Sequence, residues 1–136
     1  MTPLCIDTSA YAAFKRGDAT ITGLLESAPS LLIPAVVLGE LYAGFAIGAR
    51  RDRNLLELSQ FLSRSGCRIA TVDDGVARRY GELVRLLCER GTPLPTNDLW
   101  IAAVAFDTGA TLLTLDRHFS AVPLLPVAPD PPPVSP

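Results

Sequence analysis

The sequence predicts an α/β fold, a three-layer α/β/α arrangement with a central, mostly parallel sheet. Three observations predict it. Short apolar runs alternate with helical segments of about ten residues or more, which is typical of parallel strands joined by crossover helices. The length of 136 residues suits one domain, and a hydrophobic fraction of 49% with a mean hydropathy of +0.30 supplies a substantial core.

The first part of the chain predicts two strands and three helices. The run PLCI at 3–6 predicts a strand, and the segment DTSAYAAFKRG that follows predicts a helix closed by Gly17. Asp18 can cap a second helix, and SLLIP at 30–34 predicts a short buried strand ended by proline. The length of segment 35–49 favours a packed helix, although its glycines lower the helix propensity.

The middle of the chain predicts a helix, a strand and a second helix. Residues 51–66 carry leucines at helical spacing with charges on the other face, which predicts an amphipathic helix ended by a glycine. CRIATV at 67–72 predicts a strand. Asp73 or Asp74 is expected to cap the next helix, which Gly91 ends.

The last part predicts one more helix and two strands. After the linker TPLP, Thr96 or Asn97 is expected to cap a helix that includes the apolar run LWIAAVAF. TLLTL at 111–115 and PLLPVA at 123–128 are the remaining strand candidates. Residues 129–136, PDPPPVSP, are too proline-rich for either element and predict an extended, disordered tail.

One domain over residues 1–128 is therefore expected, followed by the tail.

The longest apolar stretches are too short to cross a bilayer and the chain does not open with a signal-peptide pattern, so we expect a cytoplasmic protein with no membrane partner. Three cysteines without C-x-x-C spacing and a single histidine argue against a disulfide framework, a structural zinc site and a catalytic triad.

The charge of the chain limits the classes of partner that it can bind. The formal net charge is −2 and the sequence pI is about 5.3, which argues against a protein that coats nucleic acid through a broad basic surface. All cations except Lys15 are arginines, and guanidinium groups suit bidentate contacts to phosphates or carboxylates. Each arginine can equally be a solvated residue on a helix face.

Two aspartates directly follow predicted strands. Asp7 follows the strand of LCI, and Asp116 follows TLLTL. Ligands of open parallel sheets bind beyond the carboxyl ends of the strands, so both side chains face the expected site. Either aspartate could instead cap the turn or helix that comes after it.

Two further acids lie on predicted helices. Glu40 is the one charged residue between Ile33 and Ala49, on a helix face that is otherwise apolar. Burying an unpaired carboxylate costs several kcal/mol, so Glu40 needs a role or a partner, and a buried ion pair with an arginine is the alternative. Asp98 lies in the first turn of its helix, where it complements the helix dipole and can also point toward the strand ends.

These four acids are expected to converge. Two carboxylates about 4 Å apart repel by roughly 4 kcal/mol at an effective dielectric of about 20, so four in one cleft either take up protons or bind a divalent cation. A site of carboxylates alone suits Mg²⁺ or Mn²⁺. Such an ion can activate a water molecule against a phosphodiester and stabilise the charge of the transition state.

With these residues in place, the chain resembles the PIN-domain ribonucleases, and specifically the VapC-type toxins of VapBC toxin–antitoxin pairs. The resemblance covers nearly the whole chain, up to about Ala128. It rests on four motifs in order: CIDTSA, VVLGELYAG, TNDLWIAAVA and LLTLDRHF. The family implies a catalytic metal site for Mg²⁺ or Mn²⁺ built from Asp7, Glu40, Asp98 and Asp116.

The resemblance also implies supporting residues around these acids. The hydroxyl after the first aspartate, Thr8 or Ser9, and the asparagine before the third, Asn97, are expected to brace the site. Thr114 is expected to do so from its strand. His118 is placed by the motif but is not a catalyst in the family, so we interpret it as a partly buried or capping side chain.

The partners that the resemblance implies are an RNA substrate, cleaved endonucleolytically, and a cognate VapB-type antitoxin. The toxin is expected to form a homodimer and, with its antitoxin, a hetero-oligomer. The C-terminal segment of such an antitoxin blocks the acids, often with an arginine.

Other classes share parts of this pattern. A haloacid-dehalogenase-like phosphatase expects a second aspartate two residues after the first, where this chain has Ser9. A receiver domain expects a lysine at the end of a late strand, and the lysine here is Lys15. A PIN-like module that has lost catalysis and only binds RNA or a partner is the third alternative; four mutually repelling acids argue against it.

Overall fold

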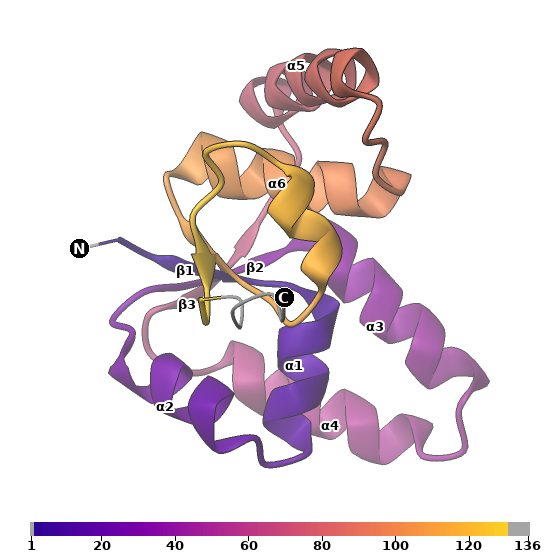
Figure 1. Ribbon diagram of the computed structural model, residues 1–136. Coiled ribbons are helices and arrows are strands. Elements are labelled where there is room, and N and C mark those ends of the chain that lie inside the picture. Colours follow the sequence, from indigo (N-terminus) through magenta and orange to yellow (C-terminus); the bar gives the residue numbers. More distant parts are fainter. Residues whose placement is uncertain (1, 131–136) are drawn as a thin grey trace, which may run out of the picture.

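The computed structural model describes residues 2–130. Five strands form one sheet in the order β3-β2-β1-β4-β5, and every pairing is parallel. The strands are β1 (Leu4–Ile6), β2 (Leu31–Pro34), β3 (Cys67–Ala70), β4 (Thr111–Leu113) and β5 (Val127–Ala128). Figure 1 shows α5 and α6 on one side of the sheet and α1, α2 and α4 on the other. The predicted three-layer α/β/α fold is confirmed.

The helices alternate with the strands as expected. They are α1 (Thr8–Lys15), α2 (Ala19–Ser27), α3 (Ala35–Ile47), α4 (Arg51–Leu62), α5 (Asp74–Arg90) and α6 (Thr96–Thr108), with a short 3-10 helix, η1 (Arg117–Ala121), after β4. Aspartates cap three of the six α-helices: the carboxylates of Asp7, Asp18 and Asp73 each accept a hydrogen bond from a backbone N–H in the first turn.

The strand order creates a switch point beside β1. The chain moves from β1 to β2 and β3 on one side, then crosses to β4 and β5 on the other. Ile6 of β1 is in register with Leu113 of β4, and the backbone N–H of Asp7 donates to the carbonyl oxygen of Leu113 at 3.2 Å. The residues that follow β1 and β4 therefore leave the sheet side by side, where α/β sheets form their ligand crevices.

The central strands and α6 carry many of the fully buried core residues. Cys5, Leu32 and Leu112 of the three central strands are fully buried. On α6, residues 101–105 are also buried, because the helix is covered by α5 on one side and by the sheet on the other. Such burial fixes the position of α6, and with it the direction of the residues in its first turn.

Several predicted boundaries differ from the structure, and β3 ends at Ala70 and β4 at Leu113, each two residues before the end of the predicted strand. α4 ends at Leu62, before Gly66, and Gly66 (φ +80°) instead lies against the backbone of Pro29, which precedes β2. The last strand, predicted over 123–128, is reduced to β5, since a turn occupies residues 123–124. α6 begins after Pro95, whose fixed extended backbone (ψ 147°) starts the helix without a side-chain cap.

The proposed division at residue 128 stays a prediction. Pro129 and Asp130 follow β5 directly, and residues 131–136 of the predicted tail lie outside the described residues. Within residues 2–130, no helix combines the length and the apolar character needed to cross a membrane.

Candidate metal site

Four acids from four parts of the chain line one pocket of about 300 Å³, which we call the acid pocket. Asp7 follows β1, Glu40 lies on α3, Asp98 lies in the first turn of α6, and Asp116 precedes η1. The other lining residues are Thr8, Ser9, Ala12 and Ile101. The structure thus brings together the four predicted acids and two of the predicted supporting hydroxyls.

Asp7 is the most buried acid, with 3% of its surface exposed. One carboxylate oxygen accepts hydrogen bonds from the backbone N–H of Ala10 at 2.8 Å and from the hydroxyl of Ser9 at 2.7 Å, and the other accepts a short hydrogen bond from the hydroxyl of Thr114. Burial raises the pKa of Asp7; these hydrogen bonds oppose that shift, and the charge of Asp116 adds to it. Asp7 both caps α1 and lines the acid pocket.

Thr114 and Ser9 tie the two strand ends together. The Thr114 hydroxyl, which donates to Asp7, also accepts from the backbone N–H of Asp116 at 2.9 Å. The Ser9 hydroxyl, which also donates to Asp7, accepts from the backbone N–H of Leu115 at 2.9 Å. This network fixes the loop of Asp116 against that of Asp7. A role for either hydroxyl in supporting a metal stays a prediction.

Glu40 is half-buried, and its partner is a hydroxyl. The side chain of Thr8 donates to its carboxylate at 2.8 Å. No arginine lies within ion-pair distance of Glu40 among residues 2–130, so the alternative of a buried ion pair is wrong. The expectation that it lies on a buried face is also only partly met, because this part of α3 borders the open acid pocket.

Asp98 is half-buried at the beginning of α6. Its pKa is raised, first by burial and then by the negative charges of Asp116 and Glu40. Its neighbour Asn97 is exposed and lines no part of the acid pocket. The predicted bracing role of Asn97 therefore has no contact to support it in this structure and stays a prediction.

Asp116 brings a histidine to the site. Its carboxylate accepts from the backbone N–H of His118 at 2.9 Å and lies 3.1 Å from the Nδ1 atom of the same residue. One potential ligand atom each from Asp98, Asp116 and His118 lie within 4.8 Å of one another. The His118 side chain is exposed, so the interpretation of a partly buried residue is wrong. Sequence reasoning missed its place beside the acids, although its spacing from Asp116 was a usable signal.

The chemistry of the acid pocket fits a divalent cation. No lysine or arginine of the described chain lines it, and the one ion pair that an acid of the pocket makes is with His118. Burial is the main cause that raises the pKa of Asp7 and of Asp98, and the neighbouring negative charges add to it. Carboxylate oxygens are the ligands that Mg²⁺ and Mn²⁺ prefer, and a bound cation would relieve this repulsion.

Divalent cations are therefore expected to stabilise the protein in a pH-dependent way. Folding raises the pKa values of Asp7 and Asp98. Between a pH equal to their ordinary pKa of 3.8 and a pH equal to the raised values, the metal-free folded chain therefore binds more protons than the unfolded chain. The stability of the metal-free protein falls as the pH rises through that window. A cation binds the deprotonated acids, so its stabilisation is greatest above the window and is lost as the pH falls through it.

Thermal unfolding with and without Mn²⁺ over a pH series measures this effect. At a free Mn²⁺ concentration about a hundred times its Kd, we expect about 2.7 kcal/mol of stabilisation at pH values above the raised pKa values of Asp7 and Asp98. Sodium chloride at equal ionic strength is the control. An equal Tm with and without Mn²⁺ at every pH would contradict the site.

Comparison with known proteins assigns the chain to a family. Residues 4–125 match the PIN domain family, so the chain is a PIN domain protein. The chain is 32% identical to Ribonuclease VapC5 of Mycobacterium tuberculosis over 117 residues (86% of this chain, 85% of the relative). It is 32% identical to Ribonuclease VapC2 of Rickettsia felis over 127 residues (91% and 90%). Within the PIN domain proteins, the chain belongs to the VapC ribonucleases.

Solved structures agree with this assignment. VapBC2 from Rickettsia felis, bound to a DNA fragment from its promoter, superposes with a TM-score of 0.83 at 27% identity, covering 93% of this chain and 97% of that chain. VapBC from Salmonella typhimurium, also bound to DNA, has a TM-score of 0.83 at 25% identity over the same shares. The family assignment excludes the phosphatase and receiver-domain alternatives.

Proposed function

We propose that this protein is a Mg²⁺- or Mn²⁺-dependent endoribonuclease that acts in the cytoplasm as the toxin of a type II toxin–antitoxin pair. The observation that carries the proposal is the convergence of Asp7, Glu40, Asp98 and Asp116 in one pocket without a lysine or arginine. These four are the proposed catalytic and metal-binding residues. The names of the curated relatives, Ribonuclease VapC5 and VapC2, support RNA as the substrate.

The proposed role of each residue in the acid pocket follows from its position. Asp7 is held by three hydrogen-bond donors and offers a fixed carboxylate at the bottom of the pocket. Asp98 and Asp116 lie nearer the solvent, and Thr8 orients Glu40 from the opposite helix. A cation bound there would supply a reactive water and neutralise charge on the phosphodiester. No nucleophilic side chain is needed, because water attacks the phosphorus atom.

Preorganisation is the contribution of the hydroxyls. Ser9 and Thr114 connect Asp7 to the backbone of residues 115 and 116, so two of the acids cannot move independently. Acids that are already oriented lose little conformational entropy when a cation and a phosphate bind. Ser9, Thr114 and Thr8 are therefore positioning residues in this proposal.

The proposed partners follow from the same charge. The acid pocket attracts a cationic side chain as well as a metal ion, so an antitoxin segment carrying an arginine would block it. VapBC toxin–antitoxin pairs from Rickettsia felis and Salmonella typhimurium are the structural neighbours that support a VapB-type antitoxin for this chain. A homodimer remains part of the proposal.

Induced expression of the wild-type chain is expected to arrest growth and to produce new RNA 5′ ends at a small set of positions. Sequencing of RNA 5′ ends before and after induction measures the cleavage, and co-expression of the cognate antitoxin should restore growth. The control is Asp98→Asn, which should give neither arrest nor new ends. Growth arrest without new ends would contradict the nuclease and favour a module that only binds RNA.

A further inference from the structure

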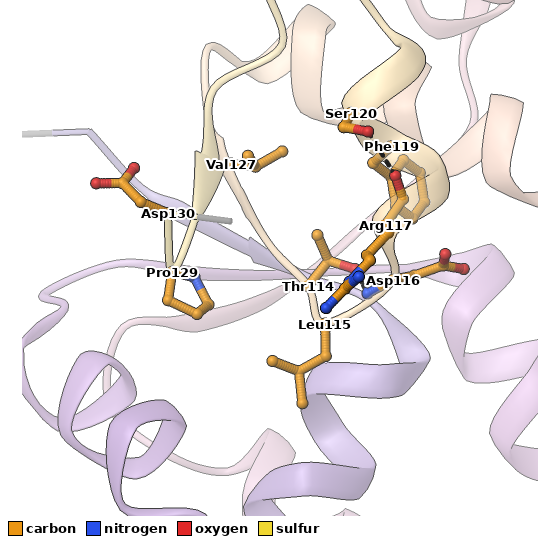
Figure 2. Close-up of a pocket in the computed structure, with 9 residues that line it drawn as sticks. All are labelled: Thr114, Leu115, Asp116, Arg117, Phe119, Ser120, Val127, Pro129 and Asp130. Carbon is orange, nitrogen blue, oxygen red and sulfur yellow. Dashed lines mark hydrogen bonds between the residues drawn. The ribbon is translucent and has the colours of Figure 1, made fainter. Parts of the chain in front are cut away.

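A second cavity adjoins the acid pocket, with a volume of about 230 Å³. We call it the Arg117 pocket, and Figure 2 shows it between η1 and the end of the chain's described part. Its lining residues are Thr114, Leu115, Asp116, Arg117, Phe119, Ser120, Val127, Pro129 and Asp130. None of the established or proposed roles above uses it.

The two pockets share one lining residue, Asp116. Thr114 also lines the Arg117 pocket, and its hydroxyl donates to Asp7 in the acid pocket. A polymer whose phosphate lies at the four acids must continue past the site on both sides. The Arg117 pocket, which shares Asp116 with the acid pocket, is a hollow that one of these directions can reach.

The lining of the Arg117 pocket suits a nucleotide. Leu115, which is 44% exposed, supplies apolar lining together with Val127 and Pro129. Figure 2 shows the exposed side chain of Arg117 beside Leu115, with Val127 and Pro129 across the pocket, and Arg117 is the one basic residue among those that line either pocket. No carboxylate of residues 2–130 forms an ion pair with it.

The volume of the Arg117 pocket suits a single unpaired base. Pockets for larger ligands commonly measure about 300–1,000 Å³, whereas this one is smaller and open. Unpaired RNA bases are bound by contact of their faces with flat or apolar side chains, and guanidinium groups bind phosphates or stack on bases. The positive charge of Arg117, which follows Asp116 in the chain, offsets part of the repulsion between the acids and an RNA backbone.

We propose that the Arg117 pocket holds the nucleotide next to the cleaved bond. Its base packs on Leu115 and Pro129, and Arg117 contacts the backbone phosphate on that side. The pocket would thereby determine which phosphodiester bond lies at the four acids, and it would contribute to the base preference beside the cut. This inference rests on the proposed ribonuclease function, and its test separates the two.

Binding is measured first, with the inactive variant Asp98→Asn, so that RNA is not cut. A fluorescent single-stranded RNA that spans a mapped cleavage position is titrated with this variant in Mg²⁺. Adding Arg117→Ala is expected to weaken binding about tenfold and to reduce the slope of log K against log salt by about 0.7. Adding Arg90→Ala, an exposed arginine at the end of α5 that lines neither pocket, is the matched control.

Cleavage positions are measured second, with Leu115→Ala in the otherwise active chain. Sequenced 5′ ends should show a changed base preference on one side of the cut, since Leu115 is exposed and its loss leaves the core intact. Unchanged affinity and salt slope for Arg117→Ala, or an unchanged preference for Leu115→Ala, would overturn the inference. A wild-type chain that binds RNA through Arg117 but never cuts it would instead overturn the ribonuclease function and leave the pocket standing.

Discussion

Replacing Asp98 with asparagine is expected to abolish RNA cleavage while the protein stays folded. Asparagine has the shape of aspartate and is tolerated at a helix N-terminus, so α6 should form as before. The substitution removes one of four charges from the acid pocket, and with it a metal ligand. Loss of several kcal/mol of transition-state stabilisation lowers kcat by about a thousandfold or more.

The raised pKa of Asp98 gives this variant a second expected property. Burial and the charges of Asp116 and Glu40 disfavour the ionised carboxylate, so the neutral amide removes an unfavourable charge. The metal-free variant should unfold at a Tm equal to or above that of the metal-free wild type. Function and stability then change in opposite directions at one residue, as is common in active sites.

A matched control separates the site from general effects of charge. Asp52 also lies in the first turn of a helix, α4, but it is exposed and lines no pocket described above. Asp52→Asn makes the same chemical change and should keep the wild-type cleavage rate. Cleavage by Asp98→Asn at the wild-type rate would remove Asp98 from the proposed site, and loss of cooperative unfolding would show that its role is structural.

Replacing Gly66 with alanine is expected to produce a large loss of stability. Gly66 has φ +80°, and a Cβ atom there would lie 2.3 Å from the carbonyl oxygen of Pro29. The carbonyl oxygen of Gly66 also accepts from the backbone N–H of Leu31 at 2.9 Å, where β2 begins. The backbone at the start of β2 would have to move, so we expect a cost of about 3 kcal/mol or more.

Gly91 provides the control for this prediction. It has a similar positive φ of +68°, but no atom outside its neighbours lies within 4 Å of a Cβ placed there. Gly91→Ala therefore tests the backbone conformation alone and should cost about 1 kcal/mol. Urea unfolding gives both values. Equal losses for the two variants would show that the contact with Pro29 has no energetic weight.

The sequence located the acids well because their positions depend on rules that act locally. Asp7 follows β1, and Asp116 follows β4 after a short loop; the carboxyl ends of parallel strands lie on one edge of a sheet whichever strands are neighbours. Asp98 was placed by the start of a long apolar helix. Glu40 was singled out because no other charge interrupts α3. Each of these inferences needed only the strand and helix pattern.

The contacts between these residues could not be predicted in the same way. Thr8 and Glu40 are 32 positions apart, and Thr114 and Asp7 are 107 apart. Such pairs depend on how elements pack, and several hydroxyls in the sequence could have served each acid. The alternative of an arginine partner for Glu40 therefore proved wrong, and packing supplied the hydroxyl of Thr8.

Local competition explains the remaining errors. Thr96 and Asn97 are both good capping residues, but Pro95 already fixes an extended backbone and starts α6 one position earlier. His118 was interpreted by its place in a motif, whereas η1 turns it back so that its ring lies beside Asp116. In both cases the residue types were favourable, and the backbone geometry of the neighbours decided the outcome.

The most direct test of the proposed function is cleavage of RNA by the purified wild-type protein, with and without EDTA. Total cellular RNA or a mapped fragment is incubated with the protein in EDTA, then with Mg²⁺ or Mn²⁺ added in excess, and the 5′ ends are sequenced. We expect no cleavage in EDTA and cleavage at defined positions once either metal is restored. Cleavage that continues unchanged in EDTA would contradict the metal-dependent mechanism on which the assignment of Asp7, Glu40, Asp98 and Asp116 depends.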